Sequence, residues 1–369
     1  MIYFDNSATS FPKPRCVIRA AKKYATHHGG NAGRSGHRLS TKSAEMLYKA
    51  REAVAQHIAF DNPERVVFTQ NATYALNLAI KGLITKPCHI ITSNMEHNSV
   101  LRPLNALKES GVSYSTFDAK ISPDIAIPPL LRSDTKFIVC TAVSNVSGME
   151  IDIYALSNIA KKYGLGLILD LSQLLGHREI DTRRLHFSAL CAPGHKGLMG
   201  LMGSGFAVFS ADSTPKPLID GGSGYDSLNE GMPSQLPERL EAGTLAAPAI
   251  ISMARGIEYI ESYGTECVGR HLSMLCSYTE ALLSSIPRIK VIGGGNGIVA
   301  FNVDDTPSTV VADMLDEHGI CVRGGMHCAP MAHRSLGTLE SGVVRISYSL
   351  FNTYDEVDRL YRLLKKEYK

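Results

Sequence analysis

From residue 65 onward, short apolar runs alternate with stretches whose apolar residues recur at helical spacing. The apolar runs at residues 66–69, 88–93 and 136–140 predict strands, and helical patterns lie between them. Strands that alternate with helices are typical of a mostly parallel sheet with helices on both faces. We therefore predict an α/β fold built on such a sheet, with residues 205–209 as a further strand at its margin.

The last third of the chain predicts a second, smaller α/β domain. Residues 247–263 and 267–285 have the patterns of two long helices, and short strands and helices follow them. A chain of 369 residues is long enough for two domains. We expect an N-terminal arm at residues 1–14 that packs with the small domain, a large domain at residues 15–244 and the small domain at residues 245–369.

Two chemically distinctive side chains follow neighbouring apolar runs. Residues 165–169 form one run that ends at Asp170, and residues 187–190 form a second run that leads to Lys196 on a turn between glycines. Chemistry in open α/β sheets gathers at the carboxyl ends of strands, so the two side chains can face one planar ligand. A lysine with an acidic partner is what pyridoxal 5'-phosphate (PLP) requires. For either residue alone, a solvated lysine or an aspartate that caps the next turn is the alternative.

Other positions suggest parts of the same site. Ala72 and Thr73 open a predicted helix, whose free N–H groups and dipole favour phosphate, although a plain N-cap is the alternative. His97 follows a predicted strand and can stack on a cofactor or bond locally. His37 lies in a glycine-rich polar loop at residues 27–40, a length of loop that is often functional.

Composition excludes several classes of protein. The net charge is only +3, and no basic run interleaves with aromatic residues, so a nucleic-acid ligand is not expected. The apolar runs are too short for a membrane span, and the first residues lack the pattern of a secretory signal, which predicts a cytoplasmic protein. The eight cysteines contain no CxxC pair, which predicts reduced thiols and no metal site.

Several segments, taken in order, carry a resemblance to a known family. They are YFDNSAT near the start, GHKGLMG around Lys196, EAGT at residues 241–244, RGGMHCAP at residues 323–330, and R-x-S followed by FNT near the end. Together they resemble the cysteine desulfurase and selenocysteine lyase branch of the class V aminotransferases, which are fold-type-I PLP enzymes. The resemblance implies the fold of a fold-type-I PLP-dependent transferase, with PLP in the large domain.

The resemblance also implies roles for individual residues in binding PLP. Lys196 matches the lysine that bonds the cofactor covalently, and Asp170 matches the carboxylate that keeps its ring nitrogen protonated. His97 matches a histidine stacked on the ring. Thr244 matches a threonine that reaches the phosphate of the other subunit, which implies a homodimer. The further matches to cofactor-binding positions are Ala72, Thr73, Gln173 and His195.

The same comparison implies a substrate site and a sulfur acceptor. Cys328 matches the cysteine that takes sulfur, in a loop of the small domain, and a nearby cation would favour its reactive thiolate. Arg345 and Asn145 match groups that hold the substrate carboxylate, and a guanidinium fork suits that task. His37 and Arg323 match further polar residues of the active site.

The implied activity is conversion of L-cysteine to L-alanine, with sulfur transferred to Cys328 as a persulfide. A selenocysteine lyase that acts on L-selenocysteine is the alternative; an aminotransferase, a β-lyase and a slow sulfur relay that depends on an acceptor protein are further ones. Among the departures from the family pattern, Pro193 stands where a serine or threonine usually contacts phosphate. The change predicts weaker PLP retention or an altered substrate.

Overall fold

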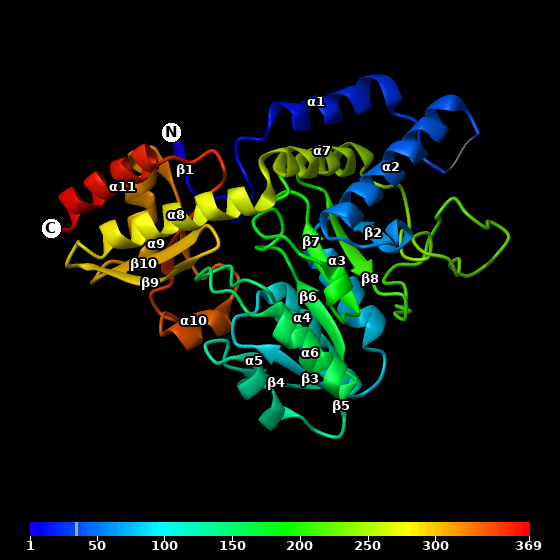
Figure 1. The fold of residues 1–369 in the computed structure, drawn as a ribbon, viewed down its shortest axis with the longest axis horizontal. Coiled ribbons are helices and arrows are strands. Elements are labelled where there is room, and N and C mark those ends of the chain that lie inside the picture. Colours follow the sequence, from blue (N-terminus) through cyan, green and yellow to red (C-terminus); the bar gives the residue numbers. More distant parts are fainter. Residues whose placement is uncertain (34–35) are drawn as a thin grey trace.

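A seven-stranded sheet forms the centre of the larger part of the molecule (Figure 1), in a computed structural model that describes residues 1–33 and 36–369. In sheet order its strands are β2 (Val66–Thr69), β8 (Gly205–Phe209), β7 (Ala189–Pro193), β6 (Gly166–Asp170), β5 (Thr135–Thr141), β3 (His89–Ser93) and β4 (Ser113–Phe117). Only β8 runs against its neighbours. The prediction of a mostly parallel sheet is therefore confirmed, whereas β8 is not at the margin, because β2 pairs with its outer edge.

Helices cover both faces of this sheet, and the side chains of its buried strands alternate between them. In β6, Leu167 and Leu169 belong to one apolar cluster with helices α2, α6 and α7, whereas Ile168 belongs to the opposite cluster with α3 and α4. The helices of this part are α1 (Arg15–Lys23), α2 (Arg38–His57), α3 (Ala72–Leu83), α4 (Asn98–Ala106), α5 (Pro123–Ala126), α6 (Ile153–Tyr163) and α7 (Ala247–Tyr263).

A smaller antiparallel sheet lies beside the first (Figure 1), and its order is β12-β13-β10-β9. Its strands are β9 (Ile289–Gly295), β10 (Ile298–Val303), β12 (Arg323–Gly325) and β13 (Val343–Ser347). The helices of this part are α8 (Thr265–Leu283), α9 (Ser308–Glu317), α10 (Pro330–Leu336) and α11 (Tyr354–Glu367). The N-terminal strand β1 (Ile2–Tyr3) pairs in parallel with β11 (Ile320–Cys321), so the chain start lies against this smaller part.

The helix that follows the predicted domain boundary packs on the large sheet. Six residues of α7 belong to the large apolar cluster, among them Ile250, Met253 and Ile257. The boundary placed between residues 244 and 245 therefore precedes a helix that still covers the first sheet, and the division into domains stays a prediction. In the part of the chain that the structure describes, no helix combines the length and apolar character needed to cross a bilayer.

Short helical turns and one loop complete the path of the chain. The loop predicted at residues 27–40 begins in a π-helical turn at Tyr24–His28 and ends where α2 starts at Arg38, and residues 34–35 lie outside the described part. Turns of 3-10 helix lie at Pro63–Arg65, Leu107–Ser110, Pro128–Leu130 and Thr182–Arg184.

Candidate active site

Lys196 lies on a tightly packed turn directly after β7. A Cβ atom at Gly194 would stand 2.3 Å from the Ser204 Oγ, and one at Gly197 would stand 2.1 Å from the Leu175 carbonyl oxygen. The contact at Gly197 is with backbone, so only glycine fits there, whereas a larger residue at Gly194 would require the Ser204 and Met253 side chains to move. The two glycines thus allow the turn to press against its neighbours and hold Lys196 in place.

One pocket at the carboxyl ends of the parallel strands brings together most of the predicted site residues. Burial lowers the pKa of the Lys196 ammonium to about 8, while the nearby Asp170 carboxylate acts in the opposite direction. A neutral lysine is therefore accessible near physiological pH. The predicted residues that line this pocket are Ala72, Thr73, His97, Asn145, Asp170, Gln173, His195 and Lys196.

Asp170 ends β6 and is only 4% exposed. Its Oδ1 accepts hydrogen bonds from the Ser172 backbone N–H, at 2.9 Å, and from the Ser172 hydroxyl. Asp170 thus bonds to the following turn, as the alternative predicted, and also lines the pocket of Lys196. The two contacts with Ser172 fix the orientation of the carboxylate.

His97 caps α4 through its ring. The Ser99 N–H donates to its Nδ1 at 3.1 Å, so the ring proton is on Nε2. Burial lowers the pKa of His97 to about 4, and the ring is neutral at physiological pH. The Ser99 hydroxyl lies 2.9 Å from the same Nδ1 and 2.8 Å from the Thr73 hydroxyl, which ties the ring to the start of α3.

The part of the pocket at the start of α3 suits an anion. Asn71 caps α3 by accepting from the Tyr74 N–H at 2.9 Å, whereas the N–H groups of the first turn have no partner within the helix. His195 also lines the pocket, and its Nδ1 is buried without a partner among the described residues. A helix N-terminus together with an unpaired histidine nitrogen fits a phosphate group. Pro193 lines this pocket too, and its effect on phosphate binding stays a prediction.

Gln173 and His195 are held by the N-terminal arm. The Gln173 side chain donates to the Ser7 carbonyl at 3.2 Å. The carbonyl of His195, next to the lysine, accepts from the Lys13 ammonium at 2.8 Å and from the Ser10 N–H at 3.1 Å. The arm therefore contacts the backbone of the lysine turn as well as the small sheet.

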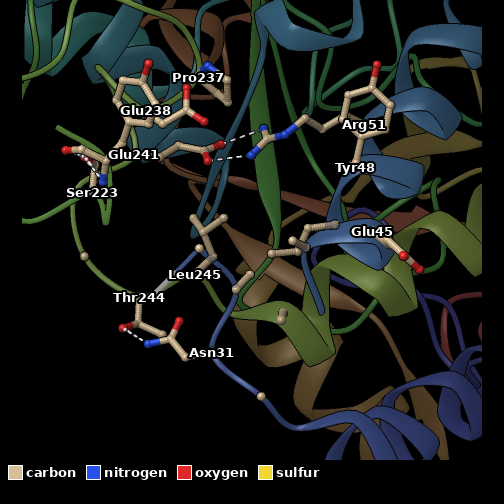
Figure 2. A pocket seen from close by; sticks show the side chains of 18 of the residues that line it. Asn31, Glu45, Tyr48, Arg51, Ser223, Pro237, Glu238, Glu241, Thr244 and Leu245 are labelled. Atoms are coloured by element: carbon tan, nitrogen blue, oxygen red, sulfur yellow. Dashed lines mark hydrogen bonds and ion pairs between the residues drawn. The ribbon is translucent and has the colours of Figure 1, made fainter. Parts of the chain in front are cut away.

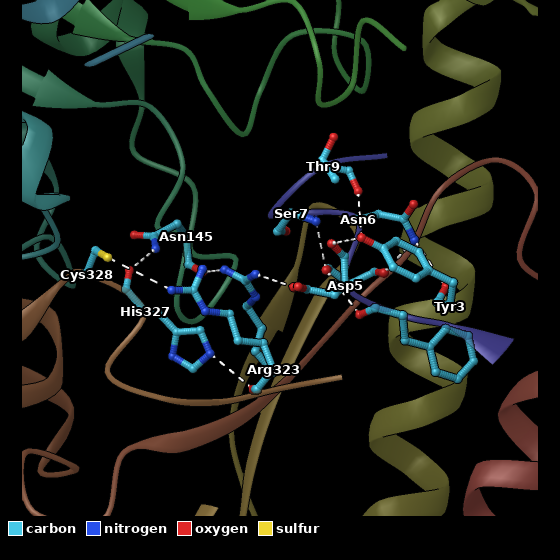
Figure 3. A network of polar contacts seen from close by, with 12 residues as sticks. Tyr3, Asp5, Asn6, Ser7, Thr9, Asn145, Arg323, His327 and Cys328 are labelled. Carbon is cyan, nitrogen blue, oxygen red and sulfur yellow. Dashed lines mark hydrogen bonds and ion pairs between the residues drawn. The ribbon is translucent and has the colours of Figure 1, made fainter. Parts of the chain in front are cut away.

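Arg345 stands on β13 and is only 1% exposed. Its Nη1 donates to the Asn145 carbonyl at 2.9 Å, and its Nη2 donates to Asp5 at 2.7 Å (Figure 3). Its Nε is buried without a partner among the described residues. Arg323 is the cross-strand partner of Arg345, so two guanidinium groups stand beside each other at the border of the two sheets.

The loop that carries Cys328 is docked against the pocket. The Asn145 side-chain amide donates to the His327 carbonyl at 2.7 Å, and the Asn98 N–H donates to the Cys328 carbonyl at 2.7 Å. The thiol itself is exposed, and its Sγ lies 3.9 Å from the Arg323 Nη2 (Figure 3). The loop of the predicted sulfur acceptor is therefore hydrogen-bonded to Asn98, which follows His97 in the chain, and to Asn145, which lines the pocket.

Five predicted residues do not line this pocket, and besides Arg345, Arg323 and Cys328 they are Thr244 and His37. Thr244 is exposed and lines a separate cavity of about 890 Å³, where its hydroxyl accepts from Asn31 at 3.4 Å (Figure 2). His37 is also exposed and caps α2 by accepting from the Ser40 N–H at 3.2 Å. Neither side chain lines the pocket of Lys196 in its own chain.

Four residues that fix the geometry of the site were not predicted from the sequence. Ser99 and Ser172 orient His97 and Asp170, Lys13 supports the lysine turn, and Asp5 pairs with Arg345. The two serines each stand two residues after the group they orient, which is the usual signal of a local side-chain cap. Asp5 had only its place in the YFDNSAT segment as a signal.

Comparisons with known proteins agree with this geometry. The family model described as Aminotransferase class-V matches residues 2–360. A probable cysteine desulfurase of Methanothermobacter thermautotrophicus is 32% identical over 99% of this chain and 94% of its own length. A probable cysteine desulfurase of Pyrococcus abyssi is 34% identical, also over 99% of this chain and 94% of its own length.

Solved structures of cysteine desulfurases are also similar to this chain. The apo structure of a cysteine desulfurase from Thermococcus onnurineus has a TM-score of 0.91 and 30% identity, and the match covers 100% of this chain and 94% of the other. The cysteine desulfurase CsdA from Escherichia coli, with a TM-score of 0.89 and 24% identity over 99% of this chain and 94% of its own, shares the fold.

Proposed function

This chain belongs to the aminotransferase class-V family, and from that membership we propose that it is a PLP-dependent cysteine desulfurase. The proposed reaction converts L-cysteine to L-alanine and transfers sulfur to Cys328. The observation that carries the proposal is the docking of the Cys328 loop on the pocket of Lys196, through Asn98 and Asn145. An aminotransferase needs no thiol at that place.

The residues of the pocket fit PLP. Lys196 would hold it covalently, Asp170 would pair with its ring nitrogen, and the start of α3 with His195 would hold its phosphate. When bound, PLP supplies an electron sink for the charge that develops on the substrate carbon. His97 and Gln173 line the same pocket and would contact the ring.

The protein's own groups account for binding and proton movement. Arg345 would hold the substrate carboxylate, because its Nε is free of other partners among the described residues. The neutral amine of Lys196 would accept the α-proton of the substrate. The Arg323 Nη2 lies 3.9 Å from the Cys328 Sγ and would contact the sulfur that attacks the substrate.

The sulfur transfer balances without a further reactant. The Cys328 thiolate attacks the substrate sulfur, so a sulfur–sulfur bond forms while the carbon–sulfur bond of the substrate breaks. The electron pair of the broken bond stays on carbon, which takes up a proton and becomes the methyl group of alanine. Cys328 is left as a persulfide, from which a thiol reductant or an acceptor protein would remove the outer sulfur.

The test is to measure alanine and sulfide formed from L-cysteine in the presence of a thiol reductant. We expect Cys328→Ala to lose nearly all turnover while it keeps the visible absorbance of bound PLP. Cys267→Ala is the matched control, because Cys267 is also exposed and lies on α8, outside the pocket. Full turnover in Cys328→Ala would falsify the persulfide step.

Further parts of the proposal concern partners and location. We expect a homodimer, in which Thr244 serves the other subunit, and a protein acceptor for the sulfur. Turnover on L-selenocysteine measured beside L-cysteine would separate the lyase alternative from the desulfurase. A cytoplasmic location stays a prediction.

A further inference from the structure

The guanidinium of Arg345 already has a carboxylate partner from the other end of the chain. Its Nη2 donates to the Asp5 Oδ1 at 2.7 Å, and the two side chains are 1% and 22% exposed (Figure 3). A desolvated guanidinium needs a counter-ion, because an unpaired buried charge is strongly unfavourable. Asp5 supplies that charge when no substrate is bound.

The backbone fixes Asp5 in this position. Its neighbour Phe4 donates its N–H to the Cys321 carbonyl at 2.9 Å and accepts from the Ser347 N–H at 2.6 Å. Asp5 itself forms a bridge with Ser347, two residues after Arg345 on β13. The carboxylate is therefore built into the edge of the small sheet and stays beside Arg345 when a ligand enters.

An incoming amino acid would place a second carboxylate on the same cation. The free position of Arg345 is its Nε, which has no partner among the described residues. Arg323, on the neighbouring strand, adds a second cation beside it. Two carboxylates on one guanidinium repel each other in a site with little water. Asp5 therefore opposes the binding that Arg345 favours.

We propose that Asp5 is a positioning residue and resident counter-ion of Arg345, which stands in for the substrate carboxylate in the free enzyme and weakens the binding of amino acids there. The inference rests on the proposed function of Arg345. Its consequence is that an amino-acid product leaves readily, because Asp5 remains as the counter-ion of Arg345 when the product departs.

The test is the affinity of the PLP-loaded protein for L-alanine, followed by the visible absorbance of the cofactor. In Asp5→Asn the side-chain oxygen can still accept a hydrogen bond from Arg345. The side chain is neutral, however, so it no longer repels the carboxylate of L-alanine. We expect the Kd for L-alanine to fall about tenfold, which corresponds to about 1.4 kcal/mol. Ethylamine, which has no carboxylate, should bind the variant and the natural protein equally.

Stability gives an independent readout of the same charge balance. Without L-alanine, Asp5→Asn should melt at a lower temperature, because Arg345 has lost its counter-ion. Saturating L-alanine should raise its Tm by more than it raises that of the natural protein, because binding stabilises the folded state. A purely structural role for Asp5 would lower the Tm without tightening the binding of L-alanine.

Control variants separate charge from shape. Asp305→Asn removes an exposed carboxylate in the turn after β10 and should change neither affinity nor Tm. Asp5→Glu keeps the charge and should bind L-alanine as the natural protein does. Asp5→Ser replaces Asp5→Asn as the neutral variant if the latter does not fold.

Unchanged or weaker L-alanine binding in the folded neutral variants would overturn the inference. That outcome differs from failure of the proposed function, which would show as a natural protein that forms no alanine from cysteine. The comparison of affinities needs only amino-acid binding and no sulfur transfer.

Discussion

Lys196 owes its chemistry to its surroundings rather than to its own structure. Burial lowers the pKa of its ammonium, Asp170 raises that pKa, and the two guanidinium groups of Arg345 and Arg323 lower it further, to a final value of about 8. An exposed lysine would be almost fully protonated at physiological pH. The pocket therefore makes a neutral amine available for bonding an aldehyde and for accepting a proton.

The rate at which the ligand-free protein bonds PLP should follow this titration. Only the neutral amine reacts, so the rate should rise as the pH increases through about 8 and level off above it. The growth of visible absorbance after PLP is added, measured across this range, checks the prediction. Lys196→Arg should give no such absorbance.

Lys13 provides the control for that experiment, because burial lowers its pKa to about 8 as well. Lys13→Arg keeps a cationic donor for the His195 carbonyl and removes the second titration. The midpoint should stay near 8 in this variant. A midpoint near 10.5, the ordinary value for lysine, would contradict the account of Lys196.

The site residues that could be predicted from the sequence are those whose residue type and immediate neighbours already indicate a chemical role. A lysine between glycines, an aspartate at a strand end and a histidine after a strand carry local signals, and all three line one pocket. Asp5 carries no local signal, because its partner Arg345 is 340 positions away and the pair forms only when β1 joins β11. Long-range partners of this kind require the folded structure.

At the scale of elements, the cysteine loop is held in an unusual backbone conformation. His327 and Cys328 have φ angles of 51° and 55°, in the left-handed region. Each such residue costs about 1–2 kcal/mol when it is not glycine. The hydrogen bonds from Asn145 to the His327 carbonyl and from Asn98 to the Cys328 carbonyl, both at 2.7 Å, offset that cost.

The His327 ring adds a further restraint on this loop. It is 2% exposed and stacks on His333 with ring centroids 5.7 Å apart. Burial lowers the pKa of His327 to about 2, so the ring stays neutral, and its Nε2 lies 3.2 Å from the Arg323 carbonyl. The imidazole beside Cys328 in sequence is therefore part of the support of the loop and is not a cation next to the thiol.

We expect Asn145→Ala to loosen the cysteine loop, because one of its two carbonyl contacts is lost. Amide hydrogen exchange at residues 326–329 should become faster, by an amount that matches about 1 kcal/mol for one hydrogen bond. Alkylation of Cys328 by iodoacetamide, followed by peptide mass spectrometry, should also change in rate. Both measurements can be made on the ligand-free protein.

Asn302→Ala is the matched control for the loop. The Asn302 amide donates to the Gly342 carbonyl at 3.0 Å on the small sheet and, among the described residues, makes no hydrogen bond with residues 326–329. This variant should leave exchange and alkylation at residues 326–329 unchanged. Equal behaviour of the two variants would show that Asn145 does not support the loop.

The order of the strands shows where prediction at this scale ends. Alternating apolar runs and helical patterns predicted the parallel strands, but β8 lies between β2 and β7 and not at the margin. The five residues of β8 are all buried, and so are the four residues of β2. Two short apolar runs look alike in sequence, and only the long-range pairing decides which of them forms the edge.

At the scale of the whole molecule, the EAGT segment at residues 241–244 begins with a buried glutamate that is held by an ion pair and ends with an exposed threonine hydroxyl. Glu241 accepts from the Arg51 Nη1 at 2.7 Å (Figure 2). It also accepts from the Phe68 N–H at 2.6 Å, so the segment is tied to both α2 and β2. Gly243 has a φ of 87°, which favours glycine. Thr244 then emerges on the surface, outside the pocket of its own chain.

This arrangement leads to a prediction about two subunits. If Thr244 serves the phosphate of the partner's PLP, Thr244→Ala should weaken PLP retention although the pocket of its own chain is intact. Lys196→Ala should be inactive, because it cannot bond PLP. A mixed dimer of the two variants contains one complete site, which combines Lys196 of one chain with Thr244 of the other.

Co-expression of the two variants with different tags tests this arrangement. Random pairing of equal amounts gives mixed dimers as half of the population, so about a quarter of all sites should regain the PLP affinity and turnover of the natural protein. Thr73→Ala paired with Lys196→Ala is the control, because Thr73 lines the pocket of its own chain and the partner cannot replace it. The control mixture should gain nothing, since each site then lacks one of its own residues. Equal recovery in both mixtures, or normal PLP retention in Thr244→Ala alone, would mean that Thr244 does not act across subunits, and its surface position would then need another explanation.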